Sequence, residues 1–232
     1  MILKLFPFQN EVMLSEEYVT IFQINNKSLF NKVANSFYDL STGQLGEENI
    51  VLLEDGKLID FEEKVLFLSD LWHFDCTSKN ITNKLLNYIE NNYKLDVELM
   101  EEIQKQLQLI RLGIRELTDE LPFEVEMKEM ITVQDLLKML GVKLAKLDGY
   151  SLLERALSII EIVEQFKLYP VIILCNIKNY FNEEDLLELY KQAIHCKIKL
   201  MIFEFGIPEK LIEYERMWYI DEDYEEFIKK PL

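Results

Sequence analysis

The chain has 232 residues, of which 49% are hydrophobic and 29% charged, a composition that is typical of globular proteins and excludes an intrinsically disordered one. This length accommodates one sizeable domain, or one domain with a large insertion. Lys and Arg number 25 and Asp and Glu number 42, so the net charge is −17, which argues against a nucleic-acid partner unless positive side chains are segregated or metal cations neutralise the acids.

The N-terminal part of the chain predicts strands around one helix. Residues 18–23 are rich in β-branched and aromatic side chains, which favours a strand. An apolar stripe from Phe30 to Leu40 predicts the helix, which ends at a pair of glycines. Two further apolar runs, residues 50–53 and 65–68, predict strands, with a turn at residues 55–57.

From Ser78 the chain is predicted to be helical. Apolar residues recur at helical spacing up to Ile89, and a longer stripe then runs from Leu99 to Leu117. Gly113, inside this longer helix, disfavours it by about 1 kcal/mol relative to Ala. Two such helices in sequence predict an extended antiparallel pair.

An acidic segment, residues 121–130, leads into alternating helices and strands. Residues 132–135 resemble a capping box that begins a short helix, and a second capping box follows at Ser151. The runs 171–175 and 200–203 predict buried strands, with a helix between them that begins at residues 182–185. This alternation with short connections implies a parallel sheet covered on both faces.

The expected fold class is therefore α/β, a parallel-sheet head with an inserted, extended α-helical leg. Because the helical stretch interrupts the head, the head is expected over residues 1–76 and 147–232. The leg is expected over residues 77–146, which include the acidic segment.

Parallel α/β sheets bind ligands at the carboxyl ends of their strands, so nucleotide binding is the first function to consider. The chain has no GxxxxGK[ST] and no GxGxxG, so the residues that cradle phosphates are missing. Asn176 and Glu204 follow two predicted strands, where nucleotide-hydrolysing enzymes often place acids. His73 and His195 suggest neither a catalytic pair nor a zinc site. We therefore expect a protein that is not an enzyme.

The acidic segment is a candidate metal site. Glu124, Glu126 and Glu129 place several hard oxygen ligands in one short stretch, after two further acids. If residues 123–127 form a strand, Glu124 and Glu126 point to the same face. This set suits Ca²⁺, which takes about 6–8 oxygen ligands. The alternative is a solvated acidic turn, and the acids of residues 213–226 are likewise expected to form a solvated surface.

Positive side chains are grouped in two places despite the net charge. Lys138, Lys143 and Lys146 lie within nine residues, and Arg111 and Arg115 share a helix face at i, i+4. Such faces could track the phosphates of DNA. The alternative is that they are merely solvated.

The three cysteines, Cys76, Cys175 and Cys196, form no CxxC pair, so we expect reduced thiols in a cytoplasmic protein. No basic region followed by an apolar run and a cleavage site suggests secretion. The most apolar stretch, residues 168–177, is shorter than the roughly 20 residues that a membrane-spanning helix needs, so we expect no membrane segment.

Several segments, taken in order along nearly the whole chain, resemble one family. The closest match is the acidic segment followed by Thr-Val-Gln-Asp-Leu-Leu-Lys-Met-Leu-Gly-Val-Lys at residues 132–143. The other matching stretches are residues 18–22, 36–39, 65–75, 171–185 and 200–204. This ordered series is similar to the small accessory adaptation protein of type II-A CRISPR systems, the Csn-two family.

The resemblance implies a degenerate P-loop-like α/β head without a phosphate loop, from which a helical leg extends. It implies four subunits in a ring whose opening admits duplex DNA, with calcium ions near the junction of head and leg that support the ring. It also implies a protein that binds free duplex ends without sequence preference. In that role it helps the adaptation integrase to acquire spacers, alongside the RNA-guided nuclease.

Carried over residue by residue, the resemblance reaches only some of the candidates. Glu124 matches the family's acidic stretch best, whereas Glu126 and Glu129 fall where this chain carries a few extra residues. Lys138 and Lys143 match basic positions, and the other basic candidates rest on their grouping alone. Positive residues that line a channel would reconcile DNA with the net charge, because physiological salt screens charges beyond about 8 Å.

Two other functions stay open at this point. The chain could be an acidic scaffold that binds proteins and not DNA. It could also be a divergent metal-dependent nuclease or NTPase, for which the acid clusters would supply the metal ligands.

Overall fold

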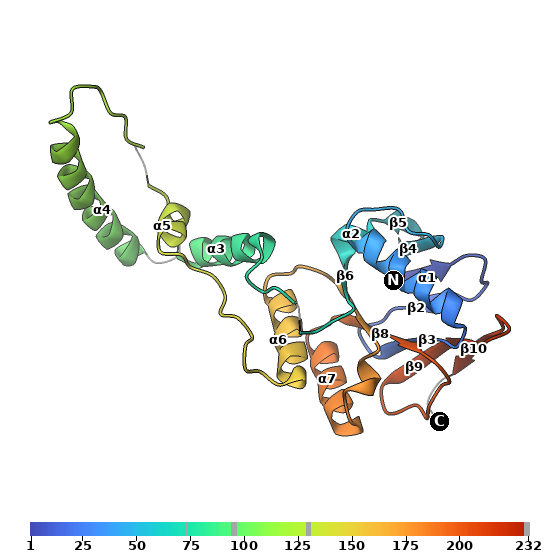
Figure 1. The fold of residues 1–232 in the computed structure, drawn as a ribbon. Helices are drawn as coiled ribbons and strands as arrows, with labels where there is room; N and C mark the ends of the chain where they lie inside the picture. The colour runs from blue at the N-terminus through green and yellow to red at the C-terminus, as the bar shows by residue number, and fades with distance from the viewer. Residues whose placement is uncertain (73, 94–96, 129–130, 230–232) are drawn as a thin grey trace. The chain divides into compact units, whose positions relative to one another are not determined.

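The computed structural model describes residues 1–72, 74–93, 97–128 and 131–229, and the chain divides into two compact units. Residues 1–74 and 147–232 form what we call the head unit, and residues 75–146 form the helical unit (Figure 1). The head unit is therefore assembled from two stretches of chain that the helical unit separates.

A six-stranded sheet forms the centre of the head unit, in the order β10-β9-β3-β8-β7-β6. Its strands are β3 (Val19–Ile24), β6 (Val65–Leu68), β7 (Val171–Cys175), β8 (Lys199–Phe205), β9 (Glu215–Ile220) and β10 (Glu226–Lys229). All neighbouring strands are parallel except β9 and β10. The predicted α/β class with a parallel sheet is confirmed, and β7 is a continuous buried run because both faces of the sheet are covered.

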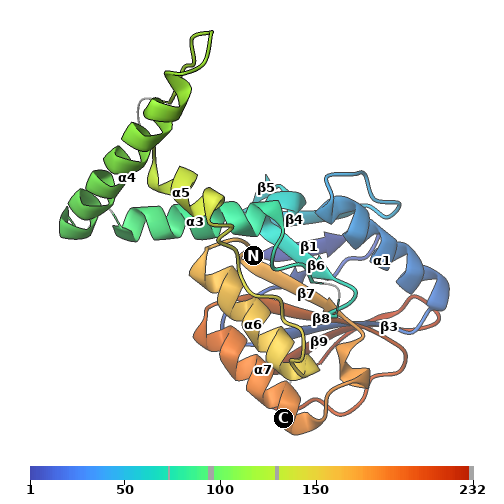
Figure 2. The same ribbon diagram turned by 60° about the vertical axis from the view of Figure 1, so that its left-hand side comes forward.

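Helices lie on both faces of this sheet (Figure 2). α6 (Leu152–Gln165) and α7 (Glu183–His195) pack together on one face, and α1 (Lys27–Ser41) lies on the other. α6 begins with the predicted capping box at Ser151, and α7 begins at the predicted start, Asn182, which also forms a capping box. In both boxes the cap side chain accepts an amide three residues on, so these starts are fixed locally.

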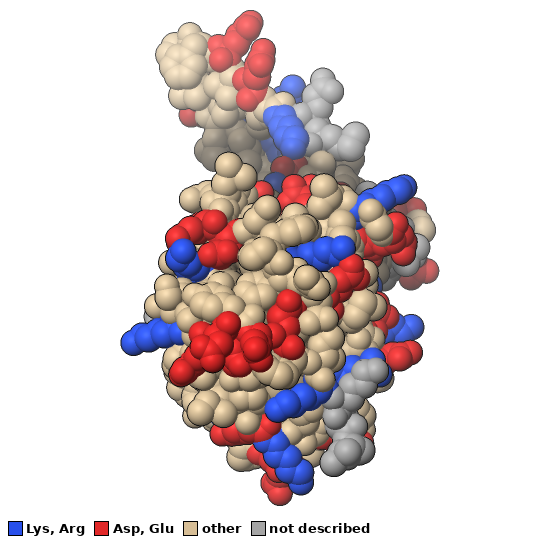
Figure 3. Space-filling view, turned by 90° about the vertical axis from the view of Figure 1, so that its right-hand side faces the viewer, with Lys and Arg blue, Asp and Glu red and all other residues tan. Residues whose placement is uncertain are grey.

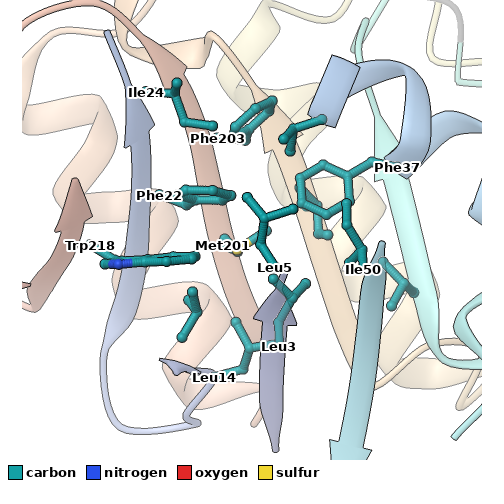
Figure 4. Close-up of a cluster of buried hydrophobic side chains, with 14 of the residues drawn as sticks. Leu3, Leu5, Leu14, Phe22, Ile24, Phe37, Ile50, Met201, Phe203 and Trp218 are labelled. Atoms are coloured by element: carbon teal, nitrogen blue, oxygen red, sulfur yellow. The ribbon is translucent and has the colours of Figure 1, made fainter. Parts of the chain in front are cut away.

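A second, antiparallel sheet packs with α1 on the same face of the large sheet. Its order is β2-β1-β4-β5, with strands β1 (Ile2–Leu5), β2 (Val12–Met13), β4 (Ile50–Glu54) and β5 (Lys57–Ile59). Its inward residues, among them Leu3, Leu5 and Ile50, join Phe22 and Trp218 in one buried cluster (Figure 4). Phe22 stacks on Trp218, its partner on the neighbouring strand β9, with 4.5 Å between ring centroids, so aromatic packing reinforces the pairing of β3 with β9 on the face that the small sheet covers.

The small sheet and the C-terminal strands differ from the sequence-based expectation. The turn at Asp55-Gly56, where φ is 50° and 76°, closes the short hairpin β4–β5, whereas the runs 50–53 and 65–68 belong to different sheets. Residues 213–226 are not simply a solvated acidic surface, because β9 lies between β3 and β10 and Glu215 is fully buried. The prediction is therefore wrong for Glu215, because a strand buried by distant partners leaves little local signal, whereas the other acids of this stretch are exposed or partly exposed.

The helical unit contains α3 (Lys79–Tyr93), α4 (Val97–Thr118) and α5 (Val133–Met139). α5 begins with the predicted capping box, in which the Asp135 carboxylate accepts the Thr132 amide at 2.9 Å. α3 packs against α5, where the Gln134 side-chain amide donates to Glu90 at 2.9 Å. In Figures 1 and 2 α4 runs at a wide angle to α3, so the predicted antiparallel pair is not formed.

α4 is a single helix that continues through Gly113. Its apolar stripe is covered only in part, because Leu107 is 5% exposed while Ile110 is 52% and Leu117 74% exposed. The segment after α4, residues 119–128, contains no strand, so the alternation that would place Glu124 and Glu126 on one strand face is absent. None of the helices in the described part of the chain is long and apolar enough to cross a membrane.

Candidate functional site

A cavity of about 1040 Å³ lies within the helical unit, between the C-terminal half of α4 and the segment that follows it. Arg111 and Arg115 line it from the helix, and Glu124 and Glu126 line it from the segment. Arg111 Nη2 donates to the main-chain oxygen of Lys128 at 2.9 Å, which holds the segment along the helix. The structure therefore brings together the two arginines predicted to bind DNA and two of the glutamates predicted to bind calcium.

This arrangement mixes charges that the sequence assigns to separate sites. Guanidinium and carboxylate groups around one cavity attract each other, so each reduces the field that the other presents to a third group. Arg115 and both glutamates are exposed, and water weakens this attraction without removing it. The cavity surface is consequently of mixed sign and is not a purely basic track for phosphates.

The described carboxylates fit a calcium ion only in part. Asp119 lines the same cavity as Glu124 and Glu126, yet within the described ranges no three acidic, histidine or cysteine side chains come together closely enough to hold one ion. Glu129, the third predicted ligand, lies outside the described residues. Because Ca²⁺ takes about 6–8 oxygens, further ligands are needed to complete its coordination shell.

The three predicted DNA-binding lysines lie apart from this cavity. Lys138 is in the last turn of α5, and Lys143 and Lys146 follow that helix in irregular chain. All three are exposed, and the described lining of the arginine cavity contains none of them. The basic candidates therefore form two groups and not one continuous surface.

The two lysines after α5 lie close to an acid. The Cys76 thiol donates to the main-chain oxygen of Ala145 at 3.2 Å, so residues 75–77 run beside residues 143–146. The Thr77 hydroxyl and amide hold the pKa of the Asp75 carboxyl below its usual value, and the positive charges of the two lysines lower it further. Asp75 is thus an anionic neighbour of this basic group.

At the carboxyl edge of the head sheet the chain passes almost directly from β3 into α1. Only Asn25 and Asn26 separate the strand from the helix, which is too short a connection to wrap a phosphate group. The Asn26 side-chain oxygen accepts the Leu29 amide at 3.0 Å, and its side-chain amide donates to the main-chain oxygen of Glu222 at 3.3 Å. The protein's own groups therefore occupy the position at which a phosphate loop would present its amides.

Two buried carboxyl groups lie on the α7 side of the head sheet, and the first is Glu204 in β8. It is 3% exposed and accepts the main-chain N–H of Lys178 at 3.0 Å, from the short helical turn η1 (Ile177–Asn179). Burial raises the pKa of Glu204 to about 7, and the main-chain hydrogen bond and positive charge of Lys178 oppose that rise. Burial therefore favours the protonated form of this carboxyl group at a higher pH than in an exposed glutamate.

Glu215, at the start of β9, is the second buried acid. Lys178 Nζ lies 2.6 Å from its Oε1, and the Tyr190 hydroxyl donates to the same oxygen at 2.8 Å. The Ile212 amide donates to Oε2 at 3.0 Å. Burial, followed by the negative charge of Glu215, raises the pKa of Tyr190 well above its usual value. Lys178 thus joins the two buried acids, by its main chain to Glu204 and by its ammonium group to Glu215.

Sequence reasoning identifies only one member of this network. Glu204 is indicated by its place at the end of an apolar run. Lys178, Tyr190 and Glu215 are far apart in the chain, and the packing of α7 against the sheet brings them together. The one local signal for Glu215 is that the apolar residues 217–220 follow it closely.

The net charge is divided unevenly between the two units. The helical unit has 10 Lys and Arg against 13 Asp and Glu, which gives 10 − 13 = −3. The head unit has the remaining 15 against 29, which gives 15 − 29 = −14. On the face shown in Figure 3, acidic side chains of the head unit gather in a patch while basic ones are scattered.

Among solved structures, the chain is similar to Stu0660 of Streptococcus thermophilus, with 15% sequence identity and a TM-score of 0.62, over 100% of this chain and 76% of that one. At this identity the likeness concerns the fold. Weaker similarity links it to a putative ABC transporter ATP-binding protein from Pyrococcus furiosus, at 12% identity, 94% and 97% coverage and a TM-score of 0.41. The ATP-binding cassette MJ0796, in a dimeric post-hydrolysis state bound to ADP and Pi, has 11% identity, 100% and 97% coverage and a TM-score of 0.38.

No curated protein matches this chain. A family model described as "CRISPR-associated protein (Cas_Csn2)" matches residues 43–224, which include most of the head unit and all of the helical unit. The resemblance inferred from the sequence is confirmed by this match and by the fold shared with Stu0660. The chain belongs to the CRISPR-associated Cas_Csn2 family, whose role lies in CRISPR adaptation.

Proposed function

We propose that the protein is a non-catalytic homotetrameric ring that binds double-stranded DNA ends without sequence preference and so supports spacer acquisition. In this proposal calcium stabilises the ring, and the protein partners are the adaptation integrase and the RNA-guided nuclease. The general role in adaptation follows from the family. The DNA ends, the calcium, the ring and the named partners are the proposal.

The uneven distribution of charge between the two units is the observation that carries this proposal. The helical unit has a net charge of −3 (10 − 13) and contains all five basic candidates, whereas the head unit has −14 (15 − 29). Non-specific binding to DNA needs positive side chains near the phosphates, and salt screens charges more than about 8 Å away. A duplex can therefore bind the helical unit in this proposal, although the charge of the head unit would repel it.

The start of α1 supports a protein without nucleotide turnover. P-loop enzymes need a glycine-rich loop whose amides point at the phosphates. Here two residues connect β3 to α1, and Asn26 caps the helix with its own side chain. Binding without catalysis is the function that this geometry fits.

A half-exposed apolar face on α4 supports assembly from several copies. Leu99, Ile110, Ile114 and Leu117 share one side of the helix and are 47%, 52%, 44% and 74% exposed. Contiguous exposed apolar surface commonly marks a protein interface. A neighbouring copy that covers this face would remove it from water.

Calcium would act where acids crowd the helical unit. Asp119, Glu124 and Glu126 line one cavity and repel one another, and a divalent cation would offset that repulsion. The described acids supply part of a coordination shell, and water or a neighbouring copy would supply the rest. If the ion binds only the assembled state, it stabilises that state by mass action.

A gel-shift series with a linear duplex of random sequence, over a range of salt concentrations, tests the DNA interface. The triple variant K138E/K143E/K146E is expected to bind at least about tenfold more weakly, because three positive charges near phosphates become negative. The matched control is K27E/K57E/K191E, which reverses three exposed lysines of the head unit and changes the net charge equally. The control is expected to keep its affinity.

The outcomes separate the competing functions. Equal losses in both triple variants would mean that only total charge matters, and would remove the helical unit from the DNA interface. An unaltered protein that shifts no duplex even at low salt would favour an acidic scaffold that binds proteins. Nucleotide turnover or DNA cleavage with Mg²⁺ or Mn²⁺ would contradict the non-catalytic part.

The calcium part has its own test. Light scattering of the full-length protein, with calcium and then with excess chelator, is expected to show a loss of mass as the ring dissociates. Unchanged mass and unchanged DNA affinity after chelation would remove calcium from the proposal.

A further inference from the structure

Three exposed aromatic residues and one arginine lie together on the head unit, and we call them the aromatic patch: Trp72, Tyr150, Arg155 and Tyr180. Trp72 follows β6, and Tyr180 follows β7 by way of η1. Because β6 and β7 are parallel neighbours, the residues after them emerge at the same edge of the sheet. Trp72 is 51%, Tyr150 50% and Tyr180 58% exposed, so water reaches all three rings.

Trp72 and Tyr180 form an edge-to-face pair. Their ring centroids are 5.4 Å apart and their planes meet at 90°. In an edge-to-face pair one ring contacts its partner only by its edge, so neither of its faces is covered by the partner. The other ring is covered on one face and keeps the opposite face free. The main-chain N–H of Trp72 donates to Asp70 Oδ1 at 2.7 Å, which fixes the turn that presents the indole. The two rings are thus held in a fixed arrangement, and aromatic faces remain accessible to solvent.

Arg155, in the first turns of α6, connects the rest of the patch. Its Nε donates to the main-chain oxygen of Tyr150 and its Nη1 to that of Trp72, each at 3.4 Å. These distances exceed the usual range for N–H···O bonds of about 2.7–3.2 Å, so both bonds are weak. Both acceptors are neutral, and no carboxylate of the described residues forms an ion pair with this guanidinium. Of the five N–H donors of an arginine, at least three remain for a ligand.

We propose that the aromatic patch binds a single DNA strand, with a base stacked on Trp72 or Tyr180 and a phosphate held by Arg155. An open aromatic face and a guanidinium are the two groups that bind single strands without reading their sequence. The patch also lies at the carboxyl edge of the parallel sheet, which is where α/β folds bind their ligands. The proposal rests on the proposed function, and it adds the unpaired bases of a frayed or tailed DNA end as a second ligand.

The charge of Arg155 decides between a nucleic acid and a protein as the occupant. Exposed tryptophan and tyrosine rings suit either, but an unpaired guanidinium beside them complements a phosphate. The head unit as a whole is acidic, so attraction depends on this one group at close range. A single phosphate contact predicts a shallow salt dependence, with a slope of about −0.7 in log affinity against log salt.

The two tryptophans of the chain make a direct test possible. Trp218 is 3% exposed and packed in the core, so a change in emission when a strand binds reports on Trp72. The full-length protein is titrated at low salt with a short oligothymidylate, and saturable quenching is expected. An abasic oligonucleotide of the same length carries the same phosphates and no bases, and it is expected to leave the emission unchanged.

Exposed-residue variants, measured by the anisotropy of a labelled oligothymidylate, check each part of the patch. Trp72→Ala is expected to lower the affinity about tenfold, whereas Trp72→Phe keeps an aromatic face, binds and loses the quenching signal. Arg155→Gln is expected to weaken binding and to flatten its salt dependence, and Arg155→Lys to restore the salt dependence. Tyr38→Ala is the matched control, because Tyr38 is also 58% exposed but lies on α1.

Affinity for a blunt duplex, measured in parallel, separates this proposal from the proposed function. Loss of single-strand binding in Trp72→Ala with blunt-duplex binding intact supports both. A protein that binds the oligothymidylate and no duplex supports the patch and overturns the ring. Equal quenching by the abasic oligonucleotide, or unchanged affinity in both Trp72→Ala and Tyr180→Ala, overturns the patch as a base-stacking site.

Discussion

At the scale of single residues, Glu204 has its chemistry changed by its position in β8. Burial raises its pKa from 4.5 to about 7, because the charged form is disfavoured away from water. The folded chain therefore keeps this proton over a pH range in which the unfolded chain releases it. The resulting contribution to stability is complete below about pH 4.5 and is lost as the pH rises through 7.

Replacing Glu204 with Gln removes this titration and keeps an oxygen that can accept the Lys178 amide. At about 1.4 kcal/mol per pKa unit, we expect E204Q to be more stable than the unaltered protein by about 3 kcal/mol at pH 8. The difference should shrink toward zero as the pH falls to about 4.5. Urea unfolding of both proteins at a series of pH values measures it. Two curves that stay parallel would show that Glu204 does not titrate on folding.

The Lys178–Glu215 pair gives a second prediction at this scale. Lys178→Met leaves Glu215 fully buried without its cation, which is expected to cost about 3–5 kcal/mol of unfolding free energy. K178M/E215Q should be less destabilised than K178M alone, because the buried charge is gone. Tyr190→Phe removes one hydrogen bond and should cost about 1 kcal/mol. An effect of K178M no larger than that of K191M, at an exposed lysine of α7, would argue against a buried ion pair.

At the scale of secondary-structure elements, the sequence predicts those features that have a local cause. The helix starts at Thr132, Ser151 and Asn182 each depend on residues three positions apart, and each forms as predicted. β9 lies between β3 and β10, and because β3 is almost 200 residues earlier in the chain, no local pattern around Glu215 and Arg216 predicts that burial. A long stripe predicts α4 correctly, but the stripe does not determine which element packs against it.

The same distinction applies to the candidate site. The sequence identifies Arg111, Arg115, Glu124 and Glu126 by residue type and spacing, but it assigns them to separate functions. The structure places all four around one cavity, because the segment after α4 returns along the helix. Such a return depends on tertiary packing, which periodicity within α4 cannot report.

The apolar face of α4 gives a prediction for this element. Ile110→Lys combined with Leu117→Lys is expected to reduce the assembly to smaller species, because both residues are more than half exposed and two charges would be buried in an interface. Size-exclusion chromatography with light scattering measures the mass. Leu109→Lys, at a residue 63% exposed on a different side of the same helix, is the control and should leave the mass unchanged. Circular dichroism should show a folded chain in every variant.

At the scale of the whole molecule, the acidity of the head unit limits how the proposed ring could hold a duplex. A ring around DNA needs to keep the helical units toward the phosphates, since the head unit has a charge of −14 (15 − 29). Binding of this kind depends on the topology of the DNA as well as on its charge. The family match supports a role in CRISPR adaptation, and the link between that role and this charge distribution is our proposal.

Capture of DNA by immobilised protein tests the threaded arrangement. A linear duplex is expected to be retained, and a closed circle of the same length and sequence is expected to be lost, because a closed ring cannot pass over a molecule without ends. Opening the circle with one restriction cut is the control and should restore retention. Equal capture of the circle and the cut form would show that the protein binds along the side of DNA.

The interrupted head unit also has a consequence for synthesis on the ribosome. β3 emerges early, yet its two neighbours in the sheet, β8 and β9, follow only after the whole helical unit. Until then both edges of β3 lack their strand partners. The stack of Phe22 on Trp218 cannot form before Trp218 has been synthesised. A nascent chain therefore exposes this apolar strand, with both of its edges unpaired, for most of its translation. Chaperone binding is expected to persist until residue 220 has left the exit tunnel, and then to end abruptly.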